Sequence, residues 1–217
     1  MKIKQLTLGP IEENTYVVSD TNGEAVIIDC GCWNEREWKI VQDYIQTNQL
    51  LVTRLLNTHL HFDHALGHRF VLRDYGLKAE AAAADFFLYE GMKEQLERLL
   101  GPHFAYKMDL SFTHAIGTPL EDGQQISIGS SVLQVIATPG HTPGGLCFYN
   151  KEDATLISGD TLFQGSIGRT DLEGGNYPTL VKSITERLLT LPPNTIVYPG
   201  HGPSTTIEHE LNYNPYL

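Results

Sequence analysis

The sequence predicts an α/β protein in which two sheets lie inside and helices lie outside. Short runs rich in Val, Ile and Leu alternate with stretches of helical periodicity, and the runs fall into two β-rich halves. Breaks made of Gly, Pro and Asn separate these runs. No shift in composition marks a linker within the 217 residues, so we expect a single domain over residues 1–217.

The first half of the chain alternates predicted strands with predicted helices. The Asn22-Gly23 pair predicts a hairpin, and therefore an antiparallel pairing of the strands on either side of it. Asn34 is suited to cap a helix, because apolar residues recur at helical spacing after it. We expect strands at residues 2–8, 14–19, 25–29 and 52–57, and helices at residues 34–46, 65–75 and 83–100.

The second half is richer in strands. Polar, turn-rich sequence precedes it and ends at Asp122-Gly123. We expect strands at residues 125–128, 131–137, 146–149, 155–158 and 195–197, and helices at residues 177–189 and 204–210.

Composition excludes several classes of function. The net charge is −11 and no run of Lys or Arg is present, which argues against a nucleic-acid partner. No apolar stretch approaches the roughly 20 residues that cross a bilayer, and the first residues lack the apolar segment of a signal peptide. Three cysteines are too few for a disulfide framework. We therefore expect a cytoplasmic protein without a membrane or nucleic-acid partner; its oligomeric state stays open.

Four potential metal ligands fall within six residues, directly after a predicted strand. In extended chain His59 and His61 point the same way, so both can reach one ion. The chain must then turn, which lets Asp63 and His64 face a neighbouring position. Imidazole and carboxylate groups are natural ligands of zinc and related divalent ions. One isolated histidine would indicate an ordinary core or surface residue, but this cluster favours a metal site.

Three later strands end in the same way. Each predicted strand runs into a turn of small residues that carries one metal-capable side chain: His141, Asp160 or His201. Glycine and proline are what a tight turn requires where the backbone passes close to an ion. The repetition predicts that these turns contribute to the same site.

The four motifs, HxHxDH, PGHTPG, SGDTLF and PGHG in this order, resemble those of the metallo-β-lactamase superfamily over residues 58–202. The resemblance implies a four-layer αββα sandwich of two mixed sheets. It also implies two divalent metal ions, zinc in the first place and iron or manganese as alternatives. The implied ligands are His59, His61 and His141 for one ion and Asp63, His64 and His201 for the other, with Asp160 bridging both.

The resemblance implies hydrolysis, because two ions that share a carboxylate lower the pKa of a shared water. Asp160 and Asp63 are the expected catalytic carboxylates, Asp63 by orienting the nucleophile. The segment Gly168-Arg169-Thr170-Asp171 and the closing Asn-Pro-Tyr-Leu resemble compact glyoxalase II-like hydrolases. A small-molecule substrate follows, a hydroxyacyl thioester such as S-lactoylglutathione. Arg169 and Asp171 are expected either to brace the active-site loop or to form an ordinary surface ion pair.

Several alternatives stay open. Full-length glyoxalase II proteins carry a further basic helical region that this chain lacks after His201, which leaves the thiol carrier undecided. Persulfide dioxygenases share the fold but use one iron, and their last histidine precedes Asp-Tyr rather than Gly202-Pro203. Common zinc β-lactamases have Cys where Asp160 stands. A lactonase, a phosphodiesterase and a metal-binding protein without catalysis are the remaining alternatives.

For most of the other notable residues we expect structural roles. Cys30 and Cys32 are expected to be partly buried thiols rather than a redox pair. Segments 86–89 and 104–106 suit either core packing or a loop over the substrate, and Tyr177 can approach the pocket. Surface or helix-packing roles are expected for His68, His103, His114 and His209, and packing roles for Trp33 and Trp38.

Overall fold

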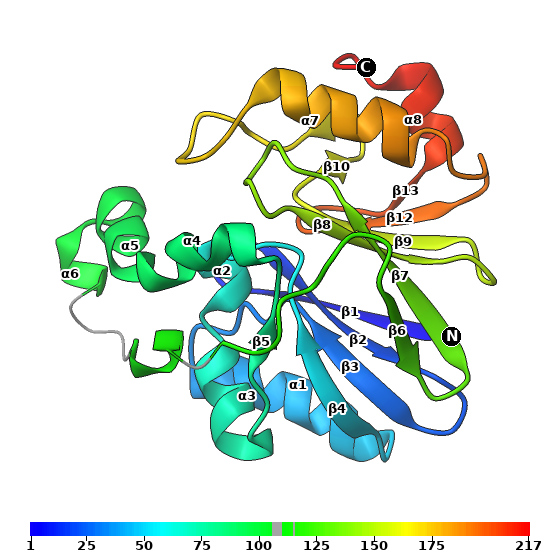
Figure 1. The fold of residues 1–217 in the computed structure, drawn as a ribbon. Helices are drawn as coiled ribbons and strands as arrows, with labels where there is room; N and C mark the ends of the chain where they lie inside the picture. Colours follow the sequence, from blue (N-terminus) through cyan, green and yellow to red (C-terminus); the bar gives the residue numbers. More distant parts are fainter. Residues whose placement is uncertain (106–109, 115) are drawn as a thin grey trace.

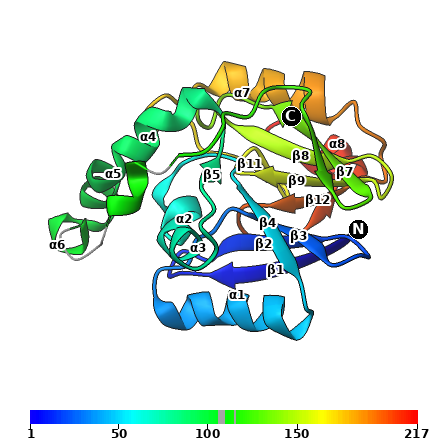
Figure 2. The same ribbon diagram turned by 60° about the horizontal axis from the view of Figure 1, so that its bottom comes forward.

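Two β-sheets pack face to face, and helices cover the outer side of each sheet (Figures 1 and 2). The computed structural model describes residues 1–105, 110–114 and 116–217. This four-layer αββα arrangement, with parallel and antiparallel strands in both sheets, confirms the predicted fold class.

The first sheet is formed within residues 2–80. Its strands, in spatial order, are β1 (Lys2–Leu8), β2 (Glu13–Ser19), β3 (Glu24–Ile28), β4 (Leu51–Leu56) and β5 (Ala79–Glu80). Strands β2 and β3 pair antiparallel around Asn22-Gly23, as predicted, whereas β3, β4 and β5 run parallel. Strand β5 was not predicted, because two residues carry no alternation that could reveal a strand.

The helices of the first half lie against the outer face of this sheet or beside its edge (Figure 1). Their bounds are α1 (Glu35–Thr47), α2 (Phe62–Ala65), α3 (His68–Tyr75), η1 (Ala83–Asp85), α4 (Phe86–Glu90), α5 (Met92–Leu100), α6 (Pro102–Ala105) and η2 (Ser111–His114). The Asn34 side chain accepts a hydrogen bond from the Glu37 amide at 3.0 Å, as expected of a helix cap.

Two predicted helices are each divided. The expected helix over residues 65–75 is wrong at its start, because α2 ends before Gly67 and α3 begins after it. A Cβ at Gly67 would overlap the Cys30 thiol and carbonyl, so the chain comes close to the turn after β3 there. The expected helix over residues 83–100 is interrupted at Gly91, where ψ is 18°.

The second sheet is formed within residues 125–206. Its strands, in spatial order, are β13 (Thr205–Thr206), β12 (Ile196–Pro199), β9 (Thr155–Gly159), β8 (Leu146–Asn150), β7 (Ser131–Ala137) and β6 (Gln125–Ile128). Its outer face carries α7 (Tyr177–Ser183), the π-helix η3 (Ile184–Leu188) and α8 (Ile207–Tyr213). Helix α8 begins three residues later than predicted, after the cap residue Thr206. A short hairpin, β10 (Leu162–Phe163) and β11 (Ser166–Ile167), was not predicted.

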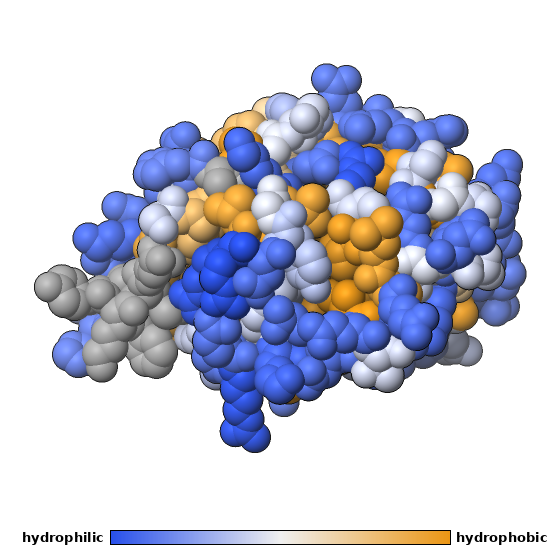
Figure 3. Space-filling view, turned by 90° about the horizontal axis from the view of Figure 1, so that it is seen from below, coloured by the Kyte–Doolittle hydropathy of each residue, from blue (hydrophilic) through white to orange (hydrophobic). Residues whose placement is uncertain are grey.

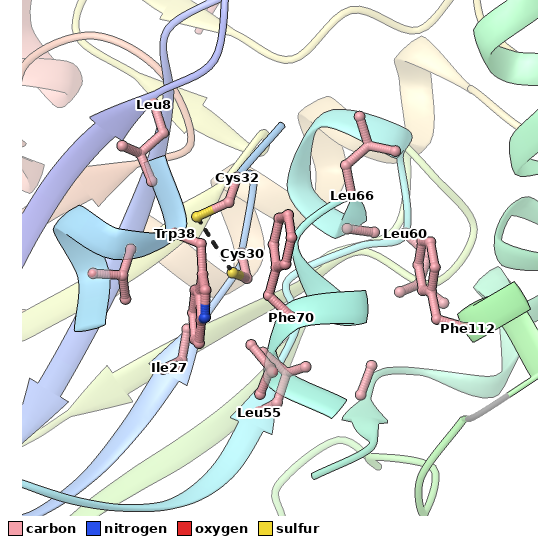
Figure 4. Close-up of a cluster of buried hydrophobic side chains, with 14 of the residues drawn as sticks. Leu8, Ile27, Cys30, Cys32, Trp38, Leu55, Leu60, Leu66, Phe70 and Phe112 are labelled. Atoms are coloured by element: carbon pink, nitrogen blue, oxygen red, sulfur yellow. Dashed lines mark hydrogen bonds between the residues drawn. The ribbon is translucent and has the colours of Figure 1, made fainter. Parts of the chain in front are cut away.

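Apolar side chains fill the spaces between the layers. The central cluster includes Val18 and Ile28 of the first sheet and Val135 and Phe148 of the second. A second cluster lies between the first sheet and its helices; Trp38 and the fully buried Cys30 and Cys32 belong to it (Figure 4). Trp38 thus packs in the core, as expected, and the two thiols, whose Sγ atoms lie 3.9 Å apart, are more deeply buried than expected.

The lower face of the molecule exposes apolar residues between hydrophilic ones (Figure 3). Exposed large apolar side chains of the structure include Ile40 of α1 and Leu51 of β4. Within the described part of the chain, no helix is long and apolar enough to cross a membrane.

Hydrogen bonds join the two halves at one edge of the sandwich. The Asn14 amide of β2 donates to the Gly200 carbonyl at 2.8 Å, and the Tyr16 hydroxyl donates to the Pro199 carbonyl at 2.6 Å. The Leu146 amide of β8 donates to the Thr58 carbonyl at 2.8 Å. The first two contacts bind the end of β12 and the loop after it to the first sheet, and the third binds the loop after β4 to the second sheet.

Candidate metal centre

The predicted metal ligands lie together at this edge, between the two sheets. The loop after β4 and the start of α2 supply a group of them, and the turns after β7, β9 and β12 supply one each. All are buried or half-buried. They are His59, His61, Asp63, His64, His141, Asp160 and His201.

The first group consists of His59, His61 and His141, whose ligand atoms lie within 4.8 Å of one another. Nδ1 of His61 is 2.9 Å from Nε2 of His141. The ring planes of His59 and His61 are nearly perpendicular, at 89°, so the rings are not stacked. Their nitrogens can therefore point toward a common position. Three imidazole nitrogens in such an arrangement can hold one divalent ion.

The second group consists of Asp63, His64 and His201, again with ligand atoms within 4.8 Å of one another. Oδ2 of Asp63 lies 3.2 Å from Nε2 of His201 and 3.5 Å from Nε2 of His64. A carboxylate and two imidazoles are the second set that the motif order implied.

Asp160 lies between the two groups. Its Oδ1 is 3.4 Å from Nε2 of His64, and its Oδ2 is 3.6 Å from Nε2 of His141 and 3.8 Å from Nε2 of His201. The two carboxylate oxygens therefore reach a member of each group, as a bridging ligand must.

The site fits metal ions on the evidence of its own atoms. Nε2 of His59, Nε2 of His64 and Oδ1 of Asp160 are buried and have no hydrogen-bond partner in the described structure. Leaving buried polar atoms unpaired costs free energy, and here the unpaired atoms are nitrogen and oxygen ligands that face one another. A pair of divalent cations would satisfy all of them.

The outer ring nitrogens are already occupied. Nδ1 of His141 lies 2.7 Å from the Arg169 carbonyl, and Nδ1 of His201 lies 3.1 Å from the Ile11 carbonyl. Because a carbonyl only accepts, the proton sits on Nδ1 in both rings and the Nε2 lone pair remains for a metal.

Burial and neighbouring charge set the protonation of the cluster. Burial, with the nearby histidines, lowers the pKa of His61 to about 3 and that of His59 well below its usual value. Both rings are therefore neutral, the form that binds metals. Burial would also lower the pKa of His64, but the surrounding aspartates, Asp63 first, outweigh it and raise that pKa well above normal. The carboxylates thus favour a cation at this place.

Asp29 is a buried carboxylate that sequence reasoning did not promote. Its Oδ2 accepts from the Thr58 hydroxyl at 2.7 Å and lies 3.0 Å from Nδ1 of His64, while its Oδ1 accepts from the Thr58 amide at 2.8 Å. Asp29 is also close enough to His59 and His64 to form a third potential ligand group, but hydrogen bonds already occupy its oxygens. It orients His64 from behind. Its position at the end of an apolar strand was the available signal.

Asp85 is the second buried carboxylate that was missed. Its Oδ1 accepts from the Gly144 amide at 2.6 Å, and its Oδ2 accepts from the Thr142 hydroxyl at 2.8 Å and the Leu60 amide at 3.3 Å. It thereby ties the loop that carries His61 to the turn that carries His141. Nothing in the local sequence around Asp85 marks this role.

Glu13 was also missed. This glutamate is fully buried beside the ligands: its Oε2 accepts from the Thr15 hydroxyl at 2.8 Å, and its Oε1 lies 3.9 Å from Nδ1 of His64. Burial raises the pKa of Glu13 well above the usual value. It is a further buried carboxyl group beside His64 of the second ligand group.

The turn after β12 approaches the ligands so closely that only glycine fits. A Cβ at Gly200 would overlap the carboxylate of Asp160 and the ring of His64. The glycine of the PGHG motif is therefore explained by close approach of the backbone, as the sequence indicated.

Arg169 and Asp171 form a two-pronged ion pair, with Nε–Oδ1 and Nη2–Oδ2 distances of 2.7 and 2.8 Å. Both side chains are more than half exposed, at 56% and 69%. The contact with a ligand comes from the Arg169 carbonyl, which holds His141. A bracing role for the ion pair itself stays a prediction.

The remaining histidines lie away from the ligands. His68 is buried, with its Nδ1 2.9 Å from the Tyr89 hydroxyl, so it packs between helices as expected. His103, His114 and His209 are exposed or partly exposed. Of the two aromatic segments, 86–89 contributes Phe87 and Leu88 to a cavity described below; in segment 104–106, Tyr106 lies outside the described residues. Tyr177 is 49% exposed.

A cavity of about 490 Å³ opens over the ligands. Its polar lining comes chiefly from the metal ligands, and its apolar walls come from several elements, including the hairpin β10–β11. The walls include Ile11, Phe62, Leu99, Leu100, Phe163, Ile167 and Leu172. A small organic substrate fits a space of this size beside the ligand atoms.

A four-layer αββα fold with buried His and Asp ligand groups at its edge defines a metal-dependent hydrolase. The chain belongs to the metallo-beta-lactamase superfamily, whose sequence model matches residues 8–201.

Relatives match along the whole chain. The chain is 37% identical over 220 residues to the Probable metallo-hydrolase YqgX of Bacillus subtilis (strain 168), covering 100% of this chain and 98% of that protein. It is 33% identical over 219 residues to the hydroxyacylglutathione hydrolase GloC of Haemophilus influenzae, with coverage of 100% and 98%.

Solved structures agree with the fold. The structure of the BLEG-1 B3 metallo-beta-lactamase matches with a TM-score of 0.88 at 35% identity, covering 100% of this chain and 99% of that one. TTHA1623 in a di-iron-bound form matches with a TM-score of 0.80 at 38% identity, with coverage of 99% and 100%.

Proposed function

We propose that this hydrolase cleaves hydroxyacyl thioesters such as S-lactoylglutathione with two divalent ions, zinc in the first place. The observation that carries the proposal is the pair of candidate ligand groups at the floor of an open cavity, with Asp160 between them. Five of their members line it: His61, Asp63, His141, Asp160 and His201. The likeness to GloC, named a hydroxyacylglutathione hydrolase, along the full length of both chains supports a thioester substrate.

Metal ions bound at such a cluster supply Lewis-acid chemistry, which activates water near neutral pH and polarises a carbonyl. His59, His61 and His141 would hold one ion, and Asp63, His64 and His201 the other. Asp160 would contribute its carboxylate to both ligand groups. Asp63 lines the cavity and is placed to accept a hydrogen bond from the attacking water.

The apolar walls give the reacting carbonyl weakly polar surroundings on several sides. Phe163 and Ile167 of the β10–β11 hairpin lie on the same cavity as Asp160 and His201. The hairpin itself is held from outside, because the Glu210 carboxylate of α8 accepts a hydrogen bond from the Gly165 amide at 2.9 Å. A weakly polar acyl group can therefore lie against the hairpin while its carbonyl reaches the ligand cluster.

The test is hydrolysis of S-lactoylglutathione by zinc-reconstituted protein, followed by loss of thioester absorbance. We expect turnover that a chelator removes and added zinc restores. No turnover by protein that carries two ions per chain would contradict the thioesterase proposal.

β-Lactam hydrolysis is the second candidate, because a structural relative at 35% identity is named a B3 metallo-beta-lactamase. A chromogenic cephalosporin in the same assay distinguishes the two. A kcat/KM for the cephalosporin above that for the thioester would favour this candidate. One bound iron per chain, with oxygen consumption on a persulfide, would instead favour persulfide oxidation.

A further inference from the structure

A second cavity of about 350 Å³ adjoins the ligand cluster. Its lining includes Gly91, the residue before α5, and Glu94, Gln95, Arg98 and Leu99 of α5. These positions follow the i, i+3, i+4, i+7, i+8 spacing, so one face of the helix forms the cavity wall. The residues Met92 and Leu96 of α5 are buried instead in the core. Figure 1 shows α4 and α5 beside the sandwich, next to α2, which carries ligands.

The side cavity is continuous with the cavity over the ligands. His61, Leu99 and Leu172 line both. A substrate whose reacting carbonyl lies at the ligand cluster can therefore extend one of its two arms along α5.

Helix α5 is fixed relative to the ligand loop by Gln95. Its Oε1 accepts from the Phe62 amide at 3.2 Å, and its Nε2 donates to the Leu88 carbonyl at 2.6 Å. Phe62 stands between the candidate ligands His61 and Asp63 in the sequence. The hydrogen bond from its amide to Gln95 therefore fixes the distance between helix α5 and these ligands. Arg98, less than one turn further along α5, is therefore held at a set distance from the reacting centre.

The side cavity has an apolar surface with charges at its margin. Phe87 and Leu99, 39% and 40% exposed, give this cavity an apolar surface that a ligand can cover. The charged lining residues are Glu94, Arg98 and Glu173, all exposed. Within the described residues Arg98 has no hydrogen bond or ion pair to an acidic side chain, in contrast to Arg169, which is paired with Asp171.

We propose that this side cavity binds the thiol carrier of the substrate, and that Arg98 binds a carboxylate of that carrier. The apolar part of the carrier would contact Phe87, Leu99 and Leu172. Arginine holds a carboxylate through two parallel N–H donors, which suits recognition at an exposed site. This inference rests on the proposed thioesterase function and names the carrier class that the function would use.

The two glutamates narrow the carrier class further. With Glu94 and Glu173 beside one arginine, and a net charge of −11 on the chain, a polyphosphate carrier would meet repulsion. A carrier with an amino-acid end offers a carboxylate to Arg98 and an ammonium group to a glutamate. We therefore assign the subsite to thiols that carry both groups.

The experiment compares lactoyl thioesters of three carriers with zinc-loaded protein: glutathione, neutral N-acetylcysteamine and coenzyme A. For wild type we expect the lowest KM with glutathione. Arg98→Ala should raise that KM about 2-fold to 5-fold, the effect of losing an exposed ion pair, and should leave kcat unchanged. The KM for the N-acetylcysteamine thioester should not change. Arg98→Lys should restore part of the affinity.

Arg36→Ala is the matched control, because Arg36 is an exposed arginine of α1 that lines neither cavity. An equal rise in KM for the charged and the neutral carrier in Arg98→Ala would overturn the subsite. So would a wild-type preference for the coenzyme A thioester.

A binding measurement separates this proposal from the proposed function. Free glutathione is titrated into isotope-labelled, zinc-loaded protein while the amide signals of α5 are followed. Shifts on α5 that disappear in Arg98→Ala would support the subsite even if no thioester were turned over, in which case only the thioesterase proposal would fail. Absence of such shifts would overturn the subsite, whatever the activity.

Discussion

The two buried carboxylates that support the ligand loops, Asp29 and Asp85, differ from the wall of the side cavity in how completely their polar atoms are hydrogen-bonded. In the cluster, Asp29 and Asp85 are fully buried, and hydrogen bonds to the ligands or their loops occupy their oxygens. The wall is formed by the α4 residues Phe87 and Leu88, one face of α5, and residues 172 and 173. Phe87 and Leu99 are exposed there, and among the described residues Arg98 has no ion pair, although its charge acts on Asp171.

This difference suggests that the ligand cluster determines the reaction and the wall of the side cavity determines which substrate is bound. A buried carboxylate whose two oxygens both accept hydrogen bonds, such as Asp29 or Asp85, cannot be replaced without leaving its partners unsatisfied. An exposed wall can change without disturbing the ligands, and so can select among substrates that share one reactive bond. Substitutions in the two regions should therefore affect different kinetic constants, and they should differ in size.

The largest effect is expected from Asp160→Ala. Because Asp160 reaches both ligand groups, its loss should remove at least one metal and lower kcat/KM about 10³-fold or more, the scale of several kcal/mol of metal-assisted stabilisation. Metal content by mass spectrometry and thioester kinetics measure both. Asp43→Ala, in an exposed aspartate of α1, is the control and should behave as wild type. Two ions and normal turnover in Asp160→Ala would contradict the bridging assignment.

Asp85→Ala tests whether the buried network matters apart from the ligands. The substitution leaves the Leu60 and Gly144 amides and the Thr142 hydroxyl without their acceptor. We expect the free energy of unfolding to fall by about 3 kcal/mol or more and zinc affinity to fall about 10-fold to 100-fold. Denaturant unfolding and zinc competition titration measure these losses. Asp85→Asn, which keeps one acceptor oxygen, should lose stability and zinc affinity by amounts between those of wild type and Asp85→Ala. Wild-type stability in Asp85→Ala would show that the network is dispensable.

Phe87→Ala tests the wall. Since this ring is 39% exposed on the side cavity, its loss should raise the KM for the thioester about 3-fold to 10-fold, with kcat and metal content unchanged. Leu51→Ala, in another exposed apolar residue remote from both cavities, should change nothing. A fall in kcat or in metal content for Phe87→Ala would show that wall and cluster are not separate.

The smallest effect is expected from Arg169→Ala. The ion pair with Asp171 is exposed, and the Arg169 carbonyl that holds His141 remains in the variant. We expect Tm to change by less than about 3 °C. The hydrogen bond from Arg169 lowers the pKa of Asp171 to about 2, so what the pair adds is present above the ordinary aspartate pKa and is lost as the pH falls toward 2. A large loss of stability at neutral pH would favour the bracing role.

The sequence pointed to these candidate ligands because they follow one local pattern. His59, His141, Asp160 and His201 each come directly after an apolar strand, and their turns contain glycine where the backbone meets a neighbour. The edges of the sheets bring such turns together, so strand order alone places them. The four-layer fold was predictable for the same reason: long strands and helices carry clear periodicity.

The parts that the sequence did not reveal depend on contacts between distant segments. Asp85 stands in an alanine-rich run, and only the fold brings it to Thr142 and Gly144. The break of the predicted helix at Gly67 arises from the approach of Cys30, again a tertiary contact. The side cavity required the spatial meeting of α5 with residues 172 and 173. Local propensity cannot encode these positions.

Anomalous diffraction from crystals of the zinc-loaded protein tests the central claim most directly. The account predicts two zinc peaks, one among His59, His61 and His141 and the other among Asp63, His64 and His201, with Asp160 contacting both. A single peak in fully loaded crystals, or two peaks that do not share Asp160, would contradict the two-metal centre from which the proposed hydrolysis follows.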